Sequence, residues 1–243
     1  MAFKKKGGEK IDVKSKEIKL NSKSKKEFFL IHGYTGSPTN FYDLPQYLNK
    51  RFNANIIIPA LIGHNTTVND LDNLNFKDFL PSLEKELKKE LNKGREIVLG
   101  GYSFGGQLAL YLASKYPVKG VFNISTPIKL KFPYNSGLEG ILGLFKKYWK
   151  KRKLTPYEKK LDKNSTHYDL AHIKGISVVK RANRYLKNCL NLIKVPCLSI
   201  QTKRDYLTDY RSSSFIDQHI KSKIKKSVVI DINTHDIFIS KER

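Results

Sequence analysis

The chain has 243 residues, of which 40% are hydrophobic, so it can bury the core of one large domain or of one domain with an insertion, and it is not a disordered tail. Forty-six basic residues against 22 acidic ones give a formal net charge of +24, which makes nucleic acid and anionic surfaces candidate partners. No apolar run approaches the roughly 20 residues that span a bilayer, and residues 1–8 lack the apolar stretch of a secretory signal, so we expect a cytoplasmic protein.

The lysines are spread along the whole chain and accompany no recognisable nucleic-acid-binding motif. Solvated lysine faces need no partner, so compositional bias accounts for the charge better than a specific nucleic-acid site, and weak contact with anionic surfaces stays open. Cys189 and Cys197 are too few for a disulfide framework and lack metal-site spacing with the histidines. We therefore expect two free, buried thiols and no metal site.

The N-terminal part of the chain predicts a basic arm followed by a strand, a loop and a helix. Residues 1–26 are rich in Lys, Ser and Glu, and a weak alternation over Ile11–Leu20 predicts an edge strand. Glu27–Ile31 is typical of a buried strand and is followed by the glycine-bearing loop His32–Gly36. Ser37 and Pro38 then favour a helix start, and apolar residues recur at helical spacing after them: Phe41, Leu44, Tyr47 and Leu48.

The next segments continue this alternation. Asn55–Pro59 is a short apolar strand that leads into a loop with Gly63 and His64. From Phe76, one helical face is apolar and the other is rich in Glu and Lys, until Gly94 ends the helix; the apolar positions are Phe79, Leu80, Leu83, Leu87 and Leu91. Strands that alternate with helices at this pace predict an α/β fold, with a mostly parallel sheet covered on both faces.

The stretch Ile97–Ala109 contains the most informative motif of the chain. An apolar run short enough for a buried strand meets small residues around Ser103, and an Ala- and Leu-rich helical pattern follows. Within it, Gly101–Gly105 fits the pattern G-x-S-x-G of a nucleophile elbow, whose strained turn projects the serine oxygen above the sheet. Because the pattern alone can arise by chance, its meaning depends on partners elsewhere in the chain.

After the elbow helix, Val118–Ile124 predicts another strand, and then the alternation breaks. Residues 128–192 show two helical patterns instead, which we interpret as an inserted cap. The first pattern is carried by Ile141, Leu142, Leu144, Phe145, Tyr148 and Trp149, and the second by Ile176, Val179, Ala182, Leu186 and Leu190. The alternation resumes with a strand over Pro196–Gln201, a helix near Arg211–Lys221 and a last strand over Ser227–Ile232.

A serine needs a base to take its proton, and the base must be an imidazole that a carboxylate holds in place. Asp205 follows one late strand and His235 follows the last one, while Ser103 ends a central strand. All three therefore fall at the carboxyl ends of parallel strands, where open α/β sheets place their sites. We predict a catalytic triad of Ser103, Asp205 and His235.

Other candidates fit these roles less well. Asp209 lies four residues after Asp205 in the same loop, but Asp205 comes sooner after the strand. Asp236 cannot easily orient the histidine adjacent to it, and His219 lies inside a predicted helix. We interpret His32 as a brace of its loop, and His64 as structural or substrate-lining.

The oxyanion that forms during acyl transfer needs two pre-aimed hydrogen-bond donors. The residue after the nucleophile supplies one through its backbone, here Phe104. The loop His32–Tyr34 follows a neighbouring strand, so the backbone N–H of Tyr34 is the second candidate.

Together these motifs make the chain resemble the α/β hydrolases, and among them the small bacterial carboxylesterases and monoacylglycerol lipases. The resemblance covers residues 27–238 except the cap, and is carried by Leu30–Gly36, Pro59–His64, Gly101–Gly106, Asp205 and His235. It implies an ester hydrolase that forms an acyl-serine intermediate without a metal or organic cofactor. It also implies a hydrolase core over residues 27–127 and 193–243, with the small helical cap at 128–192 lining an acyl pocket.

Two features depart from that family pattern. Such enzymes usually carry a closing helix after the catalytic histidine, but eight residues follow His235, so we expect this helix to be absent or truncated and its support of the histidine loop to be missing. The loop of the acidic residue reads Lys203–Tyr206, where relatives often have small or apolar residues. Neither departure removes a catalytic group.

We therefore expect a serine hydrolase that cleaves short- or medium-chain acyl esters or monoglycerides. Apolar cap residues are the predicted acyl-binding positions: Leu138, Ile141, Leu142 and Phe145. Acyl transfer, thioester hydrolysis or amide hydrolysis by the same triad is one alternative, and a non-catalytic binding protein on a hydrolase scaffold is another. The sequence leaves the physiological ester and the oligomeric state open.

Overall fold

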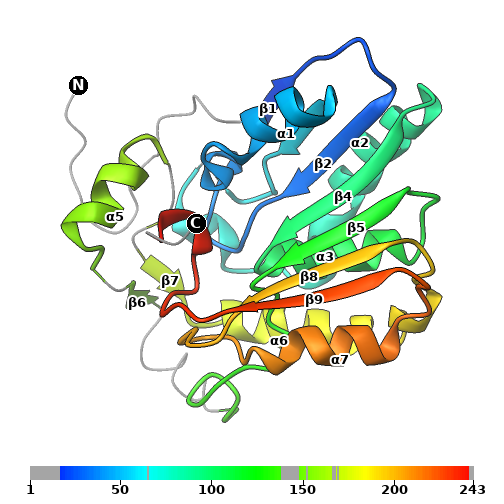
Figure 1. Ribbon diagram of the computed structural model, residues 1–243. Helices are drawn as coiled ribbons and strands as arrows, with labels where there is room; N and C mark the ends of the chain where they lie inside the picture. Colours follow the sequence, from blue (N-terminus) through cyan, green and yellow to red (C-terminus); the bar gives the residue numbers. More distant parts are fainter. Residues whose placement is uncertain are drawn as a thin grey trace.

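The computed structural model describes residues 17–64, 66–137, 148–151, 153–165, 168 and 170–240, and a seven-stranded sheet forms its centre (Figure 1). In chain order the strands are β1 (Glu17–Leu20), β2 (Lys26–Ile31), β3 (Asn55–Pro59), β4 (Glu96–Tyr102), β5 (Gly120–Ile124), β8 (Cys197–Thr202) and β9 (Lys225–Ile230). Their spatial order is β1-β3-β2-β4-β5-β8-β9. Within this sheet β1 pairs antiparallel with β3 and every other neighbouring pair is parallel, which confirms the predicted fold class.

Each face of the sheet has its own apolar core. Four helices pack on the face that carries Phe29 and Leu99: α2 (Leu80–Asn92), α3 (Phe104–Ala113), α6 (Gly175–Lys187) and α7 (Arg211–His219). The opposite face carries Leu30 and is covered by α1 (Leu44–Phe52) and by a short 3-10 turn, Ile237–Ile239. Neighbouring residues such as Phe29 and Leu30 belong to different cores because successive side chains of a strand point to opposite faces.

Two of the predicted helices are each divided in the structure. The helix expected after Ser37 consists of a 3-10 turn, Pro38–Phe41, and of α1, because Tyr42 between them has a φ of 50°. Ser37 caps the turn, since its side chain accepts the N–H of Thr39. The helix expected from Phe76 likewise consists of a 3-10 turn, Phe76–Phe79, followed by α2. Three further 3-10 turns are Val68–Leu71, Asp162–Asn164 and Leu190–Leu192.

The segment that we predict to be an inserted cap contains strands as well as helices. β6 (Tyr148–Lys150) and β7 (Leu170–His172) pair antiparallel, apart from the main sheet, and α5 (Pro156–Leu161) separates them in the chain. The predicted helix is therefore wrong for Tyr148 and Trp149, while its other four positions lie outside the described residues. The second helical pattern is confirmed by α6 for four of its positions, while the fifth, Leu190, lies in a 3-10 turn after the helix. In Figure 1, α5, β6 and β7 lie beyond the carboxyl ends of the sheet strands.

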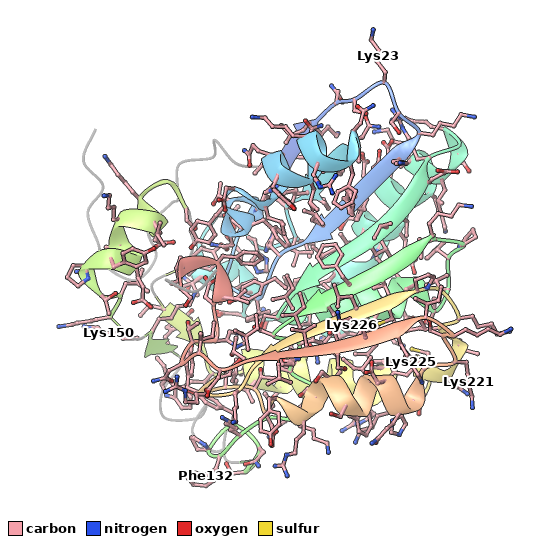
Figure 2. All side chains as sticks on the ribbon, in the orientation of Figure 1. Lys23, Phe132, Lys150, Lys221, Lys225 and Lys226 are labelled. Atoms are coloured by element: carbon pink, nitrogen blue, oxygen red, sulfur yellow. The ribbon has the colours of Figure 1, made fainter. Side chains whose placement is uncertain are left out.

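Lysines are distributed over the periphery of the molecule. Figure 2 labels Lys23 after β1, Lys150 in β6 and Lys221 after α7, at separate edges of the fold. Lys225 and Lys226 are exposed on β9, an edge strand, where lysines discourage pairing with another chain. Among the described residues, no helix is both long enough and apolar enough to cross a membrane.

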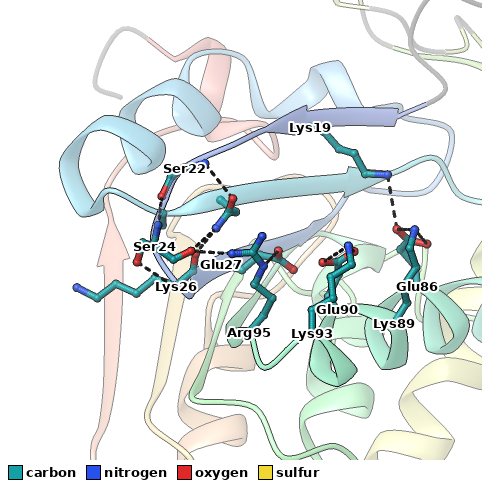
Figure 3. A network of polar contacts seen from close by, with 12 residues as sticks. Lys19, Ser22, Ser24, Lys26, Glu27, Glu86, Lys89, Glu90, Lys93 and Arg95 are labelled. Atoms are coloured by element: carbon teal, nitrogen blue, oxygen red, sulfur yellow. Dashed lines mark hydrogen bonds and ion pairs between the residues drawn. The ribbon is translucent and has the colours of Figure 1, made fainter.

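A network of charged side chains lies at the amino ends of β2 and β4 (Figure 3). Glu27 of β2 is 2% exposed, and its Oε2 lies 3.7 Å from Nε of Arg95. Glu90 of α2 is equally buried and accepts a hydrogen bond of 2.7 Å from Nζ of Lys93. Burial raises the pKa of Glu27 to about 7, and the negative charge of Glu90 adds to this effect while Arg95 and Lys93 oppose it.

Candidate active site

Ser103 lies in a strained turn between β4 and α3. Its φ of 54° is in the left-handed region, which residues with a side chain seldom adopt. The glycines around it permit the turn: a Cβ on Gly101 would lie 2.2 Å from the carbonyl oxygen of Gly105, and a Cβ on Gly105 would lie 1.9 Å from that of Ile31. The motif G-x-S-x-G therefore forms the sharp strand-turn-helix connection expected for it.

The structure brings Ser103, His235 and Asp205 into one chain of hydrogen bonds. Nε2 of His235 lies 2.8 Å from Oγ of Ser103, and Nδ1 lies 2.6 Å from Oδ2 of Asp205. Asp205 is fully buried, and the other two residues are at most 9% exposed. Ser103, Asp205 and His235 follow β4, β8 and β9 in turn, so the parallel strands place the three side chains at one edge of the sheet.

Backbone groups hold the Asp205 carboxylate in place. Its Oδ1 accepts the N–H groups of Leu207 at 2.7 Å and of Thr208 at 3.0 Å, which leaves Oδ2 for His235. The main-chain carbonyl of Asp205 accepts a further bond of 2.6 Å from Nζ of Lys131. These bonds fix the carboxylate in the orientation in which it faces the imidazole.

The charge of Asp205 sets the proton affinity of His235. Burial disfavours the charged imidazolium, but the negative charge and hydrogen bond of Asp205 outweigh burial and raise the pKa of His235 above 6.5. Because Nδ1 faces a carboxylate, it carries the proton, and Nε2 is left to accept the hydroxyl proton of Ser103.

Aromatic packing supports the loop that carries His235. The ring of Phe238, three residues on, packs against Phe41, Tyr42 and Tyr102 at centroid distances of 5.7, 6.2 and 5.6 Å. Thr202 adds a hydrogen bond from its hydroxyl to the carbonyl oxygen of residue 234. Among the described residues, these contacts hold the loop of His235 in place.

Two backbone N–H groups beside Ser103 have no acceptor among the described residues. Phe104 is the first residue of α3, so its N–H lies at a helix N-terminus and has no helical partner. Tyr34 belongs to the loop after β2, where a Cβ on Gly33 would lie 3.3 Å from Cβ of Ser103. The rings of Tyr34 and Phe104 pack edge to face at 5.6 Å, so the loop of Tyr34 lies against the start of α3 beside the serine.

His32 fixes the peptide that carries the Tyr34 N–H. Its Nε2 accepts the N–H of Leu61 at 3.1 Å, so Nδ1 carries the proton and donates to the carbonyl oxygen of Gly33 at 3.0 Å. The N–H of Gly36 donates to the same oxygen at 3.1 Å. Because the peptide is planar, fixing this carbonyl also fixes the direction of the Tyr34 N–H. The expectation that His32 braces its loop is confirmed.

The other candidate residues are placed elsewhere. Asp209 pairs with Arg211, and no bond joins it to His235 in the described part of the structure. His219 is exposed at the end of α7. The predicted acyl-binding residues lie outside the described residues. A surface depression lies in the β6–β7 region and includes neither Ser103 nor His235; its lining residues are Tyr148, Trp149, Lys150 and Leu170.

Sequence reasoning missed the two N–H groups that hold the Asp205 carboxylate. An aspartate whose side chain accepts N–H groups two and three residues later is a common local pattern. The order Asp205-Tyr206-Leu207-Thr208 was compatible with that pattern and could have strengthened the choice of Asp205 over Asp209.

Comparisons with known proteins agree with this geometry. The family model described as "alpha/beta hydrolase fold" matches residues 27–172, which is more than half of the chain. A carboxylesterase of Bacillus subtilis (strain 168) is 22% identical over 219 residues, covering 90% of this chain and 87% of its own. A thermostable monoacylglycerol lipase of Bacillus sp. (strain H-257) is 30% identical over 102 residues, covering 42% of this chain and 40% of its own.

Solved structures show the same fold. A structure from work on the metagenome-derived lipolytic enzymes LipS and LipT superposes with a TM-score of 0.82, at 17% identity, and covers 96% of this chain and 94% of its own. At this level of identity the superposition establishes the arrangement of the elements, whereas the chemistry must be argued from the residues themselves.

Proposed function

Since the chain belongs to the α/β-hydrolase family and resembles its esterases and lipases, we propose that it hydrolyses carboxylic esters through an acyl-serine intermediate. The observation that carries the proposal is the continuous hydrogen-bond chain from the Ser103 hydroxyl through His235 to the buried Asp205 carboxylate. A histidine held in this way directs its basic nitrogen, Nε2, at the Ser103 hydroxyl. A hydroxyl needs such a base to act as a nucleophile.

In the first half of the reaction, Oγ of Ser103 attacks the ester carbonyl carbon while Nε2 of His235 takes the hydroxyl proton. Asp205 stabilises the imidazolium that results, because its carboxylate already lies on Nδ1. The carbonyl oxygen becomes an oxyanion, to which the N–H groups of Tyr34 and Phe104 donate. The imidazolium then returns its proton to the departing alcohol, and the acyl group stays on the serine.

In the second half, water replaces the alcohol. His235 removes a proton from the water as its oxygen attacks the acyl-serine carbon, and the same two N–H groups receive the second oxyanion. When this intermediate collapses, the proton passes back to Oγ of Ser103 and a carboxylic acid leaves. Apart from the substrate and this water, the groups that transfer protons and bind the oxyanion all belong to the chain.

The substrate class that we propose is a short- or medium-chain acyl ester or a monoglyceride. The names of the two curated relatives, a carboxylesterase and a monoacylglycerol lipase, support this choice. The predicted apolar positions Leu138, Ile141, Leu142 and Phe145 are the proposed contacts of the acyl chain.

A fluorophosphonate probe tests the proposal directly, because it labels a serine only when that serine is activated. We expect the wild-type protein to be labelled and Ser103→Ala not to be. Ser125→Ala is the matched control: Ser125 directly follows β5, as Ser103 follows the neighbouring β4, is fully buried and also has a positive φ, so its loss should leave labelling intact. Hydrolysis of p-nitrophenyl esters of increasing chain length measures the acyl preference. A folded wild-type protein that is neither labelled nor active on any ester would refute the proposal.

A further inference from the structure

Besides His235 and His32, the described residues contain a third buried histidine, His64, to which the proposed mechanism gives no role. It is 4% exposed and lies in the loop after β3, where its ring contacts His32, Tyr34, Phe79 and Tyr168 at centroid distances of 5.0, 5.9, 6.0 and 6.3 Å. A polar ring buried among aromatic side chains needs a partner for each nitrogen. Both partners are backbone groups, and one of them belongs to the oxyanion loop.

The hydrogen bonds of His64 settle which nitrogen carries the proton. Nε2 lies 3.0 Å from the N–H of Thr35 and therefore accepts from it, which leaves Nδ1 to donate to the carbonyl oxygen of Ile62 at 3.0 Å. Burial lowers the pKa of His64 to about 4, so the ring stays neutral and its acceptor stays available over the ordinary pH range. His64 is thus a fixed acceptor for one peptide N–H.

That N–H belongs to a strained residue. Thr35 has a φ of 61°, a left-handed conformation that strains a β-branched residue, and it is 3% exposed. It follows Tyr34 directly, so the N–H assigned to the oxyanion and the N–H bound by His64 are consecutive. If Thr35 relaxed to an extended conformation, the peptide between Tyr34 and Thr35 would turn. The Tyr34 backbone, whose N–H is assigned to the oxyanion, would then be held only from its other side, through the Gly33 carbonyl.

The same residue is held from its other side by the inserted segment. The carbonyl oxygen of Thr35 accepts the N–H of Tyr168 at 3.1 Å and lies 3.4 Å from Nζ of Lys151. Tyr168 is 6% exposed, and its hydroxyl donates to the carbonyl oxygen of Gly63 at 2.9 Å, next to His64. One tyrosine of the insertion therefore contacts both the oxyanion loop and the loop that carries His64.

From these contacts we propose that His64 is a positioning residue that holds the oxyanion loop in its active form, and that Tyr168 supports the same loop through Thr35 and Gly63. The proposal rests on the proposed function, since it assigns the Tyr34 N–H to the oxyanion. His64 touches no reacting atom; it acts through Thr35. Losing it should reduce stabilisation of the transition state while leaving binding of the ground-state ester largely unchanged.

The test compares His64→Leu, His64→Gln and Tyr168→Phe in ester hydrolysis. In His64→Leu we expect kcat to fall about 100-fold, as when an oxyanion donor is lost, with KM within about threefold of the wild-type value. The amide oxygen of His64→Gln can accept the Thr35 N–H, so this variant should recover at least about tenfold of the lost kcat. Tyr168→Phe keeps its backbone bond to Thr35 and should lose less than His64→Leu. His219→Leu, at an exposed histidine far from these contacts, is the matched control and should behave as wild type.

A transition-state analogue separates positioning from a general structural role. The affinity for a trifluoromethyl ketone, which forms an oxyanion adduct with the serine, should weaken in parallel with kcat across the variants, whatever their melting temperatures. The inference is overturned if folded His64→Leu keeps kcat within threefold of wild type, or if kcat follows thermal stability alone and the affinity for the ketone stays constant.

Amide hydrogen exchange gives a readout that needs no turnover. In the peptide that spans residues 33–36, exchange should be faster in His64→Leu than in the wild type and intermediate in His64→Gln. If the wild-type protein hydrolyses no ester but the exchange pattern appears, the proposed function fails while the brace on the loop stands. If the esters are hydrolysed and the exchange and kcat of every folded variant match wild type, the inference alone fails.

Discussion

The buried carboxylate of Glu27 should make the folded protein lose stability as the pH rises towards 8. An unfolded chain ionises this group near its ordinary pKa of 4.5, whereas in the folded protein the pKa is raised to about 7. The folded state therefore binds a proton that the unfolded state has already released between these two values. The stabilisation is fully present below about pH 4.5 and is lost as the pH rises through 7.

The size of this effect follows from the two pKa values. A displacement from 4.5 to about 7 corresponds to about 3 kcal/mol at about 1.4 kcal/mol per pH unit, and most of it, about 2 kcal/mol or more, falls between pH 5 and pH 8. Glu27 is 2% exposed and its Oε1 has no hydrogen-bond partner among the described residues, so water does little to screen it. Glu90 and Glu86 face it as negative charges, and Arg95 and Lys93 as positive ones.

Urea denaturation at pH 5, 6, 7 and 8 measures the effect, with Glu27→Gln as the variant that cannot ionise. The difference in unfolding free energy between wild type and variant should change by about 2 kcal/mol or more across this range, with the wild type losing the more. Taking the difference removes the effect of the large positive net charge, which both proteins share. Glu86→Gln, in the same network but more exposed, is the control and should leave the pH dependence in place. Parallel profiles for wild type and Glu27→Gln would refute the reasoning.

Three further outcomes are expected. Asp205→Asn should lower kcat on the order of 10⁴-fold and move the acid limb of the kcat/KM profile to lower pH, because the carboxylate that raises the pKa of His235 is gone; an unmoved limb would contradict this. Gly105→Ala should cost about 3 kcal/mol or more in urea denaturation, because its Cβ would lie 1.9 Å from a β2 carbonyl oxygen, whereas Gly120→Ala, with 3.4 Å to its nearest neighbour, should cost far less. Burial raises the pKa of the Cys197 thiol to about 12, so iodoacetamide at pH 8 should label it only after denaturation, and rapid labelling of the native protein would count against the packing described.

The sequence was sufficient to locate the sheet and the hydrogen-bonded triad because each signal was local. Ser103, Asp205 and His235 each follow a short apolar run, and runs of that kind mark the strands whose ends meet. The division of the helix after Ser37 was not visible, because it depends on one backbone angle at Tyr42. Tyr148 and Trp149 were assigned to a helix because a three-residue strand is too short to display its own period.

The contacts that could not be predicted are those between loops. His64 and Thr35 are 29 residues apart, and nothing in either segment indicates that a ring nitrogen of one meets a peptide N–H of the other. Glu27 is the second residue of β2, where a charged residue is usually exposed, and its burial depends on the last turns of α2, which carry Glu90, lying beside the amino end of the strand. Such contacts are set by tertiary packing and leave no period or motif in the sequence.

The order of the strands has a consequence for biosynthesis. Ser103 is in place once β4 and its neighbours have formed, but Asp205 and His235 arrive with β8 and β9, which are the last strands along the chain and add to one side of the sheet. A nascent chain that has emerged from the ribosome only as far as α6 thus contains Ser103 but neither Asp205 nor His235. Under the proposed function, reaction of Ser103 with an active-site probe would report that β8 and β9 have docked. The time at which this reaction appears would measure when folding is completed during translation.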